Sequence, residues 1–500
     1  MELSILPKAL LFTLFLFLSG GCQPLAAETG NGADGLLSSE FSYRPGMNRG
    51  DFYTQRDLLR DKHWQQPTDD ETSIQYAKKL FEIGDFSAAD RVLNTLPKGV
   101  LHSAESMLIA AEMEYCEGRY GQAEILFKKA YDLTSGPTKE AAGKGLVLTY
   151  YQSGQYQMAD QVGTIPEEFS YLQEMMKQFG SRKPFEIDWR GNRQVELPFL
   201  MSIDGNLPII AMKVNGRPVN VLIDTGCDNF DLDESVAAAV GLKAEIQMTG
   251  QFAGGLTADI LYGVADSVEF GGLKIQSVPV AVSQIGWEYV DELNSRTIPV
   301  NGIIGIGILQ RFLATMDYPG EMLILRPKGQ SGHELFEKSQ STGTKLVKMP
   351  FVMADTHFML AKGAINDQKN LNMFLDSGLQ EPEAAILLEK ETLDYVGIPV
   401  PEKNVATPDG QGGLGGSDFS VGEFQIADFH LGQLHRKDLV GLYGVIPNSL
   451  YFGSGLIVDG IISHNFLKKY QWTIDFDSME MIFIEPTGKS ADDPTEPPLR

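Results

Sequence analysis

Two aspartates in this chain stand in nearly the same local setting. Asp224 lies in the stretch VLIDTG and Asp376 lies in the stretch MFLDSG. A carboxylate at the end of a buried strand is costly unless it is paired. Asp, Thr and Gly are also ordinary turn residues, so either motif alone could be a turn. The chemistry of the two aspartates therefore depends on whether the fold brings them together.

A pair of touching carboxyl groups can hydrolyse a peptide bond. Two such groups cannot both ionise cheaply, so they share one proton across the working pH range. The ionised member can take a proton from a bound water while the protonated member hydrogen-bonds the peptide carbonyl. Thr225 and Ser377 offer hydroxyls that can fix the loops across an interface. Gly226 and Gly378 remove side chains where backbone and carboxylate must pack closely.

The second half of the chain repeats itself once. The two aspartates lie 152 residues apart (376 − 224), and two Pro-Phe stretches have the same separation (347 − 195). The landmarks in chain order are VELPF at 195–199, DTG at 224–226, GIIGIGIL at 302–309 and TMDY at 315–318, against VKMPF at 347–351, DSG at 376–378, GIISHNFL at 460–467 and TIDF at 473–476. Short alternating apolar runs broken by glycine predict strands throughout. We expect two all-β lobes related by a pseudo-twofold axis, with the aspartates at their interface.

The paired motif resembles that of the aspartyl protease superfamily. With about 150 residues per lobe and DTGCD in the first, the resemblance is closest to bacterial retropepsin-like proteins and spans roughly 190–486. It implies an aspartic endopeptidase with Asp224 and Asp376 as the catalytic pair, and a second chain is not required because both lobes are present. It also implies Gly-rich flaps over the substrate, with counterparts at Gly254 and Gly255 in the first lobe. The run with Gly412 and Gly413 in the second lobe is the other counterpart, or a plain flexible turn.

The second copy departs from the first in two places. The residues after Asp376-Ser377-Gly378 are LQEP, and SHN at 463–465 replaces small apolar residues. A lobe altered in this way could bind peptides without cutting them. A non-catalytic peptide- or protein-binding protein is therefore the alternative function, and a scaffold in which only the helical part matters is a third. We expect His464 at the surface or in a turn and Cys227 as a small buried filler.

Residues 71–180 have a helical pattern with an internal repeat. The segments GDFSAA, GRYGQA and GQYQMA begin at Gly84, Gly118 and Gly154, which are 34 and 36 residues apart. This Gly-x-aromatic-x-x-Ala period resembles tetratricopeptide repeats. Glycine permits a tight turn between paired helices, and alanine lets their backbones approach closely. Such arrays bind peptides or protein partners, or serve as spacers.

Composition excludes several classes of function. A net charge of −25 lacks the basic footprint that nucleic acid requires and disfavours an anionic membrane surface. The 3 cysteines form no disulfide framework or CxxC site, and the 7 histidines show no ligand spacing. We therefore predict no metal and no cofactor.

The first residues read as an export signal. An apolar run of signal-peptide length follows Lys8 and is too short to span a bilayer. The ending LSGGC resembles a bacterial lipobox and predicts lipidation of Cys22, although the leucine lies four residues before the cysteine rather than three. Cleavage after Ala27 is the alternative. We expect the protein in the bacterial cell envelope or secreted, with membrane contact only through that lipid anchor.

The predicted architecture is an all-α helical array followed by an all-β bilobal aspartic-protease fold. The predicted segments are an export signal at 1–27, a linker at 28–70, helical repeats at 71–180, lobe 1 at 190–330, lobe 2 at 340–486 and an unfolded tail at 487–500.

Overall fold

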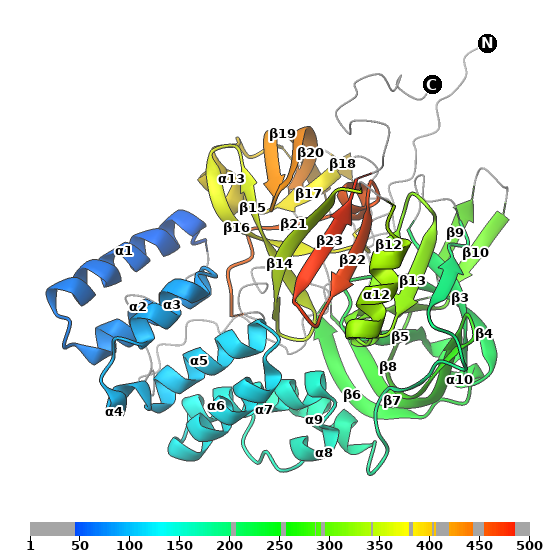
Figure 1. Ribbon diagram of the computed structural model, residues 1–500, viewed down its shortest axis with the longest axis horizontal. Coiled ribbons are helices and arrows are strands. Elements are labelled where there is room, and N and C mark those ends of the chain that lie inside the picture. The colour runs from blue at the N-terminus through cyan, green and yellow to red at the C-terminus, as the bar shows by residue number, and fades with distance from the viewer. Residues whose placement is uncertain are drawn as a thin grey trace.

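The chain folds into a helical region followed by a β-rich region, as Figure 1 shows for the computed structural model. The structure describes residues 46–201, 207–251, 257–285, 287–291, 296–341, 344–379, 384–402, 405–406, 420–443 and 455–485. This arrangement confirms the predicted fold class of a helical part in front of a β protease-like part. Among these residues no helix has both the length and the apolar character needed to cross a membrane. The predicted signal segment, Cys22 and the tail from 487 lie outside the described residues.

The helical region runs from Arg49 to Lys177. Glycines with positive φ end the first helix of each hairpin: Gly84 at +76°, Gly118 at +74° and Gly154 at +72°. Only glycine adopts this left-handed conformation cheaply, so the repeated glycine sets the repeated turn. The helices are α1 Arg49–Gln65, α2 Asp70–Glu82, α3 Phe86–Leu93, α4 Lys98–Leu101, α5 Ala104–Cys116, α6 Tyr120–Leu133, α7 Pro137–Ser153, α8 Tyr156–Ala159 and α9 Ser170–Lys177, with a 3-10 turn at Glu167–Phe169.

Residues 28–70 were expected to be a linker, and helix α1 corrects this expectation for Arg49–Gln65. The helix begins with a capping box in which the side chain of Asn48 accepts from the Asp51 amide and the side chain of Asp51 accepts from the Asn48 amide. Its buried residues are Arg49, Phe52, Leu59 and His63, so half of its buried positions are polar. The apolar period that identifies an amphipathic helix was therefore too weak to read from the sequence.

Lobe 1 contains an eight-stranded sheet with the short strand β1 at one edge. The strand order is β1-β8-β5-β11-β4-β3-β7-β6. The elements are β1 Glu186–Asp188, β2 Val195–Pro198, β3 Ile209–Val214, β4 Arg217–Ile223, β5 Phe230–Asp233, α10 Glu234–Ala239, β6 Ala244–Gln251, β7 Thr257–Phe270, β8 Leu273–Ser283, β9 Trp287–Asp291, β10 Arg296–Val300, β11 Gly302–Ile304, α11 Ile306–Leu309, β12 Leu313–Asp317, β13 Met322–Arg326 and α12 Gln330–Ser339.

Lobe 2 repeats this plan. Strand β21 lies parallel to β16 and antiparallel to β17, as β11 lies parallel to β4 and antiparallel to β5. The elements are β14 Leu346–Ala354, β15 Phe358–Ile365, β16 Gln368–Leu375, β17 Ala384–Leu388, α13 Lys390–Val396, β18 Val405–Ala406, β19 Ser420–Leu431, β20 Leu434–Tyr443, β21 Gly460–Ile462, α15 His464–Leu467, β22 Gln471–Asp475 and β23 Glu480–Ile484.

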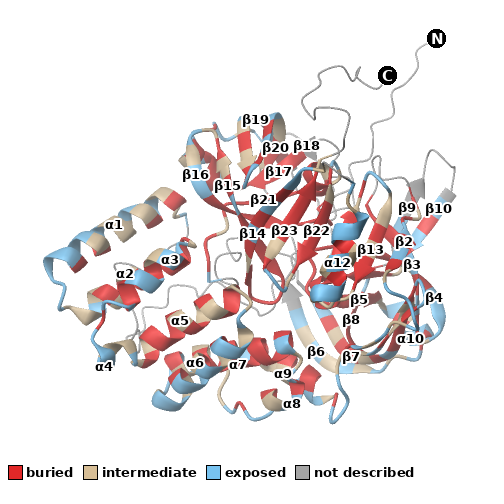
Figure 2. Cartoon of the chain, viewed as in Figure 1, coloured by how far each residue is buried: buried red, intermediate tan, exposed pale blue. Residues whose placement is uncertain are grey.

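One continuous sheet joins the two lobes. Its central order is β2-β13-β12-β22-β23-β14, which reads the same from either end once each strand is matched with its copy. At the middle, Thr315 of β12 pairs with Thr473 of β22, and their hydroxyls are 2.7 Å apart. These two residues are copies of each other, so the pseudo-twofold axis passes between them. Strands β22 and β23 are almost continuously buried, whereas the outer turns of α1 and α6 are exposed (Figure 2).

The helical region contacts both lobes. From α7, the Tyr151 hydroxyl donates to Asn229 of lobe 1 at 3.3 Å, and the Gln152 side chain donates to the Thr356 carbonyl of lobe 2 at 2.9 Å. From α5, the Tyr115 hydroxyl donates to the carbonyl of Asp355 in lobe 2. The helices therefore lie across the junction of the lobes (Figure 1).

Candidate active site

Equivalent loops place the two aspartates at the lobe junction. Asp224 follows β4, and its amide donates to the carbonyl of Ile304 in β11 at 3.0 Å. Asp376 follows β16, and its amide donates to the carbonyl of Ile462 in β21 at 3.0 Å. Strands β11 and β21, which come from the GIIGIGIL and GIISHNFL stretches, thus hold the start of the two aspartate loops. The same distance in both lobes shows that the backbone support of Asp376 is intact.

Each carboxyl group packs against the glycine of the opposite lobe. A Cβ atom on Gly378 would lie 2.1 Å from Cγ of Asp224, and one on Gly226 would lie 2.6 Å from Cγ of Asp376. No real side chain fits at such distances, so glycine is required at both positions. The structure therefore brings the two predicted aspartates together across the pseudo-twofold axis. Both are fully buried.

Backbone amides hold one oxygen of each carboxyl group. Gly226 donates to Asp224 Oδ1 at 2.7 Å. Gly378 and Leu379 each donate to Asp376 Oδ1 at 2.9 Å. Among the described residues no backbone amide holds either Oδ2. The Oδ2 atoms are thus the ones left for reacting groups.

Burial raises the pKa of both carboxyl groups of the pair. For Asp224 burial is the largest cause and raises the pKa to about 6, while the hydrogen bond from the Gly226 amide acts in the lowering direction. Burial also raises the pKa of Asp376 well above its usual range, and the charge and hydrogen bond of Asp224 raise it further. Near neutral pH the two carboxyl groups therefore share one proton.

Four hydrogen bonds lock the two loops together. The amide of Thr225 donates to Ser377 Oγ at 2.9 Å, and the amide of Ser377 donates to Thr225 Oγ1 at 3.0 Å. The Thr225 hydroxyl donates to the Leu375 carbonyl at 2.9 Å, and the Ser377 hydroxyl donates to the Ile223 carbonyl at 3.4 Å. Each hydroxyl reaches across the lobe interface, as expected from the sequence.

The altered stretch of lobe 2 fits its surroundings. Ser463 occupies the position of Gly305 as the residue before the short helix, and its hydroxyl donates to the Ala384 carbonyl at 2.6 Å. The expectation that His464 lies at the surface is wrong, because only 2% of it is exposed. Its ring packs edge-on against Tyr318 at a centroid distance of 5.2 Å. The sequence showed no apolar period here that would have signalled burial of a histidine.

Two further acidic residues beside the dyad were not predicted as site residues. Burial, then the charge of Asp355, raises the pKa of Asp228 to about 7. Burial also raises the pKa of Asp231 well above its usual range, and neither of its carboxyl oxygens has a hydrogen-bond partner among the described residues. The sequence stretch DNFD at 228–231 was the signal that could have identified these two residues. Asp228 lies just before the buried strand β5, and Asp231 lies within it. Cys227 is fully buried, which agrees with a filler role.

The flap candidates fall outside the described residues. Strands β6 and β7 pair up to Gln251 and Thr257, so residues 252–256 connect two antiparallel strands. Gly254 and Gly255 belong to that connection, and Gly412 and Gly413 belong to residues 407–419; neither pair is described. The predicted flap role of both pairs stays a prediction.

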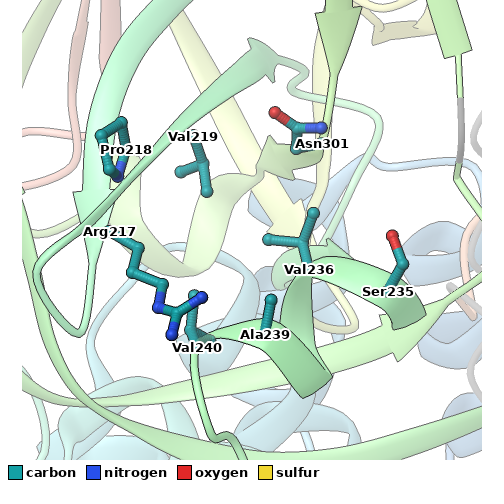
Figure 3. Close-up of a pocket in the computed structure, with 8 residues that line it drawn as sticks. All are labelled: Arg217, Pro218, Val219, Ser235, Val236, Ala239, Val240 and Asn301. Atoms are coloured by element: carbon teal, nitrogen blue, oxygen red, sulfur yellow. The ribbon is translucent and has the colours of Figure 1, made fainter.

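A surface pocket of about 540 Å³ lies elsewhere on lobe 1 (Figure 3). It is bounded by the start of β4 at Arg217 and Pro218, by α10 and by Asn301. The pocket includes neither aspartate and no residue of their loops, so it is not the site described above.

Comparison with known families points to the same lobe. Residues 210–308 match the family model described as aspartyl protease. The match runs from β3 to α11 and so contains the DTG loop and the stretch that supports it. No curated protein matches the chain. The assignment of lobe 2 therefore depends on the duplicated geometry rather than on a family match.

Proposed function

We propose that this protein is an aspartic endopeptidase that hydrolyses peptide bonds with a water activated between Asp224 and Asp376. The observation that carries the proposal is the reciprocal packing of each carboxyl group against the glycine of the other lobe. The aspartyl protease match of residues 210–308 supports the same activity at the level of the family.

The single proton shared by the pair gives the two carboxyl groups different roles. The ionised member accepts a proton from the attacking water, and the protonated member donates a hydrogen bond to the substrate carbonyl. The water oxygen bonds to the carbonyl carbon and gives a tetrahedral intermediate. Proton transfer to the leaving nitrogen then breaks the C–N bond. Both aspartates come from one chain, so a dimer is not needed to form the site.

The test is hydrolysis of a mixed peptide library from acid to neutral pH. We expect Asp224→Asn and Asp376→Asn each to lower kcat/KM by about 10³-fold or more, because general acid–base catalysis contributes up to about 10⁴-fold. Asp394→Asn is the matched control, because its carboxylate is exposed on α13 and pairs with Lys390 of the same helix. It should leave cleavage unchanged.

The outcome also separates the two predicted functions. Full activity in either dyad variant would refute the proposal. A wild-type chain that is folded and binds peptides but cuts none would instead support the non-catalytic binding protein. An inhibitor with a hydroxyl at the scissile position should bind the wild type and lose affinity in both Asn variants.

The remaining predictions concern location and the helical region. We propose that residues 1–27 direct export to the bacterial cell envelope, with Cys22 as a lipid attachment site. We further propose that the helical hairpins are of the tetratricopeptide type. Mass spectrometry of the mature N-terminus tests the first proposal, because lipidation of Cys22 and cleavage after Ala27 give different masses.

A further inference from the structure

A second group of chemically active side chains lies on the hairpin formed by β19 and β20 of lobe 2. The strands pair antiparallel, with His430 opposite His435 next to the turn. Asp428 lies two residues before His430, so both side chains leave the strand on the same face. The hairpin contributes no residue to the two aspartate loops.

The Asp428 carboxylate faces both imidazole rings. Its Oδ1 lies 2.6 Å from Nε2 of His435, and its Oδ2 lies 3.3 Å from Nε2 of His430. The rings stack with centroids 4.3 Å apart and planes 3° apart. One donor atom from each residue lies within 4.8 Å of the other two. Two nitrogens and a carboxylate oxygen thus converge on one small volume.

We propose that Asp428, His430 and His435 bind a divalent transition-metal ion of the zinc type. Zinc bonds to imidazole nitrogen and carboxylate oxygen at about 2.0–2.2 Å, so donors around one ion lie roughly 3–4 Å apart. The donor atoms of the cluster lie within 4.8 Å of one another, and rotation of the two stacked imidazole rings would direct their nitrogens toward one ion. Imidazole donors favour zinc, copper and nickel over magnesium and calcium.

The surroundings admit an ion. The side chains of His430 and His435 are 41% and 43% exposed, so water can reach the cluster and complete the coordination. On the other side of His430 the facing residue is Ala364 of β15, which is small. Lys437 lies opposite Asp428 but is exposed, and its flexible stem can keep the ammonium in solvent.

A bound ion would join β19 to β20 beside their turn. Binding to the folded state alone stabilises that state by mass action. In sequence, one residue separates Asp428 from His430, and four residues separate His430 from His435. Only the register of the hairpin brings the three side chains together. This is why the sequence showed no metal-site spacing.

The test is calorimetric titration of the untagged full chain with zinc at neutral pH, with thermal unfolding in excess zinc as a second readout. We expect one ion per chain and a rise in Tm. Affinity should fall at least about tenfold in His430→Ala and in His435→Ala, because each removes one of three ligands. Asp428→Asn should weaken binding without removing a ring.

His333→Ala is the matched control. His333 also pairs with a carboxylate, Asp475, at 2.8 Å and is 39% exposed, but within the described part of the chain it belongs to no three-residue cluster. Its replacement should leave zinc affinity unchanged. Absence of zinc binding by the wild type, or equal affinity in the wild type and both hairpin histidine variants, would overturn the proposal. Circular dichroism of each variant distinguishes lost ligands from lost folding.

Discussion

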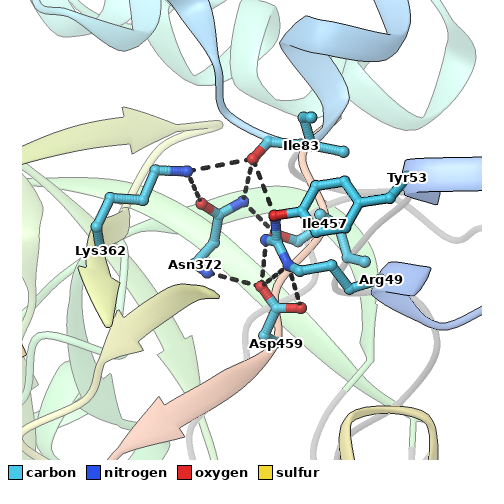
Figure 4. A network of polar contacts seen from close by, with 7 residues as sticks. All are labelled: Arg49, Tyr53, Ile83, Lys362, Asn372, Ile457 and Asp459. Atoms are coloured by element: carbon cyan, nitrogen blue, oxygen red, sulfur yellow. Dashed lines mark hydrogen bonds and ion pairs between the residues drawn. The ribbon is translucent and has the colours of Figure 1, made fainter. Parts of the chain in front are cut away.

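Arg49, the first residue of α1, forms a buried ion pair with Asp459, 410 positions later in the chain. Its Nε donates to the two carboxylate oxygens at 2.8 and 2.9 Å, and both side chains are 1% exposed. Asp459 also accepts the amide of Asn372 in β16 at 2.6 Å, so the pair connects the helical region to the strand that leads to Asp376 (Figure 4). The helices are therefore anchored to the support of the dyad rather than attached loosely in front of it.

Removal of Arg49 should destabilise the fold strongly. Arg49→Met keeps most of the side-chain volume but leaves the Asp459 carboxylate buried without its cation, which costs about 3–5 kcal/mol. Urea unfolding measures the loss. Arg56→Met on the same helix is the control, because Arg56 forms a partly exposed pair with Asp57 and should cost less than about 1 kcal/mol. Equal losses in the two variants would contradict the anchoring role.

The dyad could be predicted from the sequence, whereas the anchoring of the helices could not. Asp224 and Asp376 were recognisable because a duplication preserves spacing, and pseudo-symmetry then places the copies at one interface. Arg49 and Asp459 carry no such signal, since each looks like an ordinary charged residue until the fold buries them together. The cluster of Asp428, His430 and His435 was hidden for a different reason, because only the register of the β19–β20 hairpin brings these neighbouring residues together. Patterns within one element are readable, but charge pairs between distant elements are not.

Gly378→Ala should abolish most activity with its loops still folded. The new Cβ would overlap the Asp224 carboxyl group, and no positive φ strains the backbone at this position, so the effect is displacement of that carboxyl group. A misplacement of about 1 Å costs roughly 100-fold in rate. Peptide cleavage measures the change.

Gly121→Ala serves as the control for that substitution. Gly121 lies in α6 with nothing within 4 Å of an added Cβ. The change should keep full activity and stabilise the helix by about 0.5–1 kcal/mol. A wild-type rate in Gly378→Ala would mean that the Asp224 carboxyl group does not occupy the observed position during catalysis.

Thr225→Val should loosen the junction of the lobes. Valine keeps the shape but removes a hydroxyl that accepts from the Ser377 amide and donates to the Leu375 carbonyl. Two buried polar groups then lose their partner, at a cost of about 2–4 kcal/mol. Thr225→Ser retains the hydroxyl and should restore most of the stability in denaturant unfolding. Equal losses in both variants would assign the effect to the methyl group instead.

The rate of peptide cleavage should rise with pH through the pKa of Asp224. Below about pH 6 that carboxyl is protonated and cannot accept a proton from water. Above it the singly protonated pair persists, because the pKa of Asp376 is raised further, and activity falls again when Asp376 ionises. Measurement of kcat/KM from pH 4 to 9 should give a bell with its acidic limb near 6. A maximum near pH 4 would contradict the buried environment of the pair.

Asp224→Asn should stabilise the protein at neutral pH while it removes activity. The folded pKa of about 6 exceeds the ordinary value of 3.8, so the folded state binds a proton more tightly than the unfolded state. The contribution of Asp224 to stability is therefore most favourable when this group is protonated, and it falls as pH rises from about 4 to 6. At about 1.4 kcal/mol per pH unit, ionisation costs roughly 3 kcal/mol above pH 6.

Asparagine carries no charge and can still accept from the Gly226 amide. Urea unfolding should show the two proteins equally stable near pH 4 and the variant more stable near pH 7. If the difference did not grow with pH, burial would not be what raises the pKa of this carboxyl group.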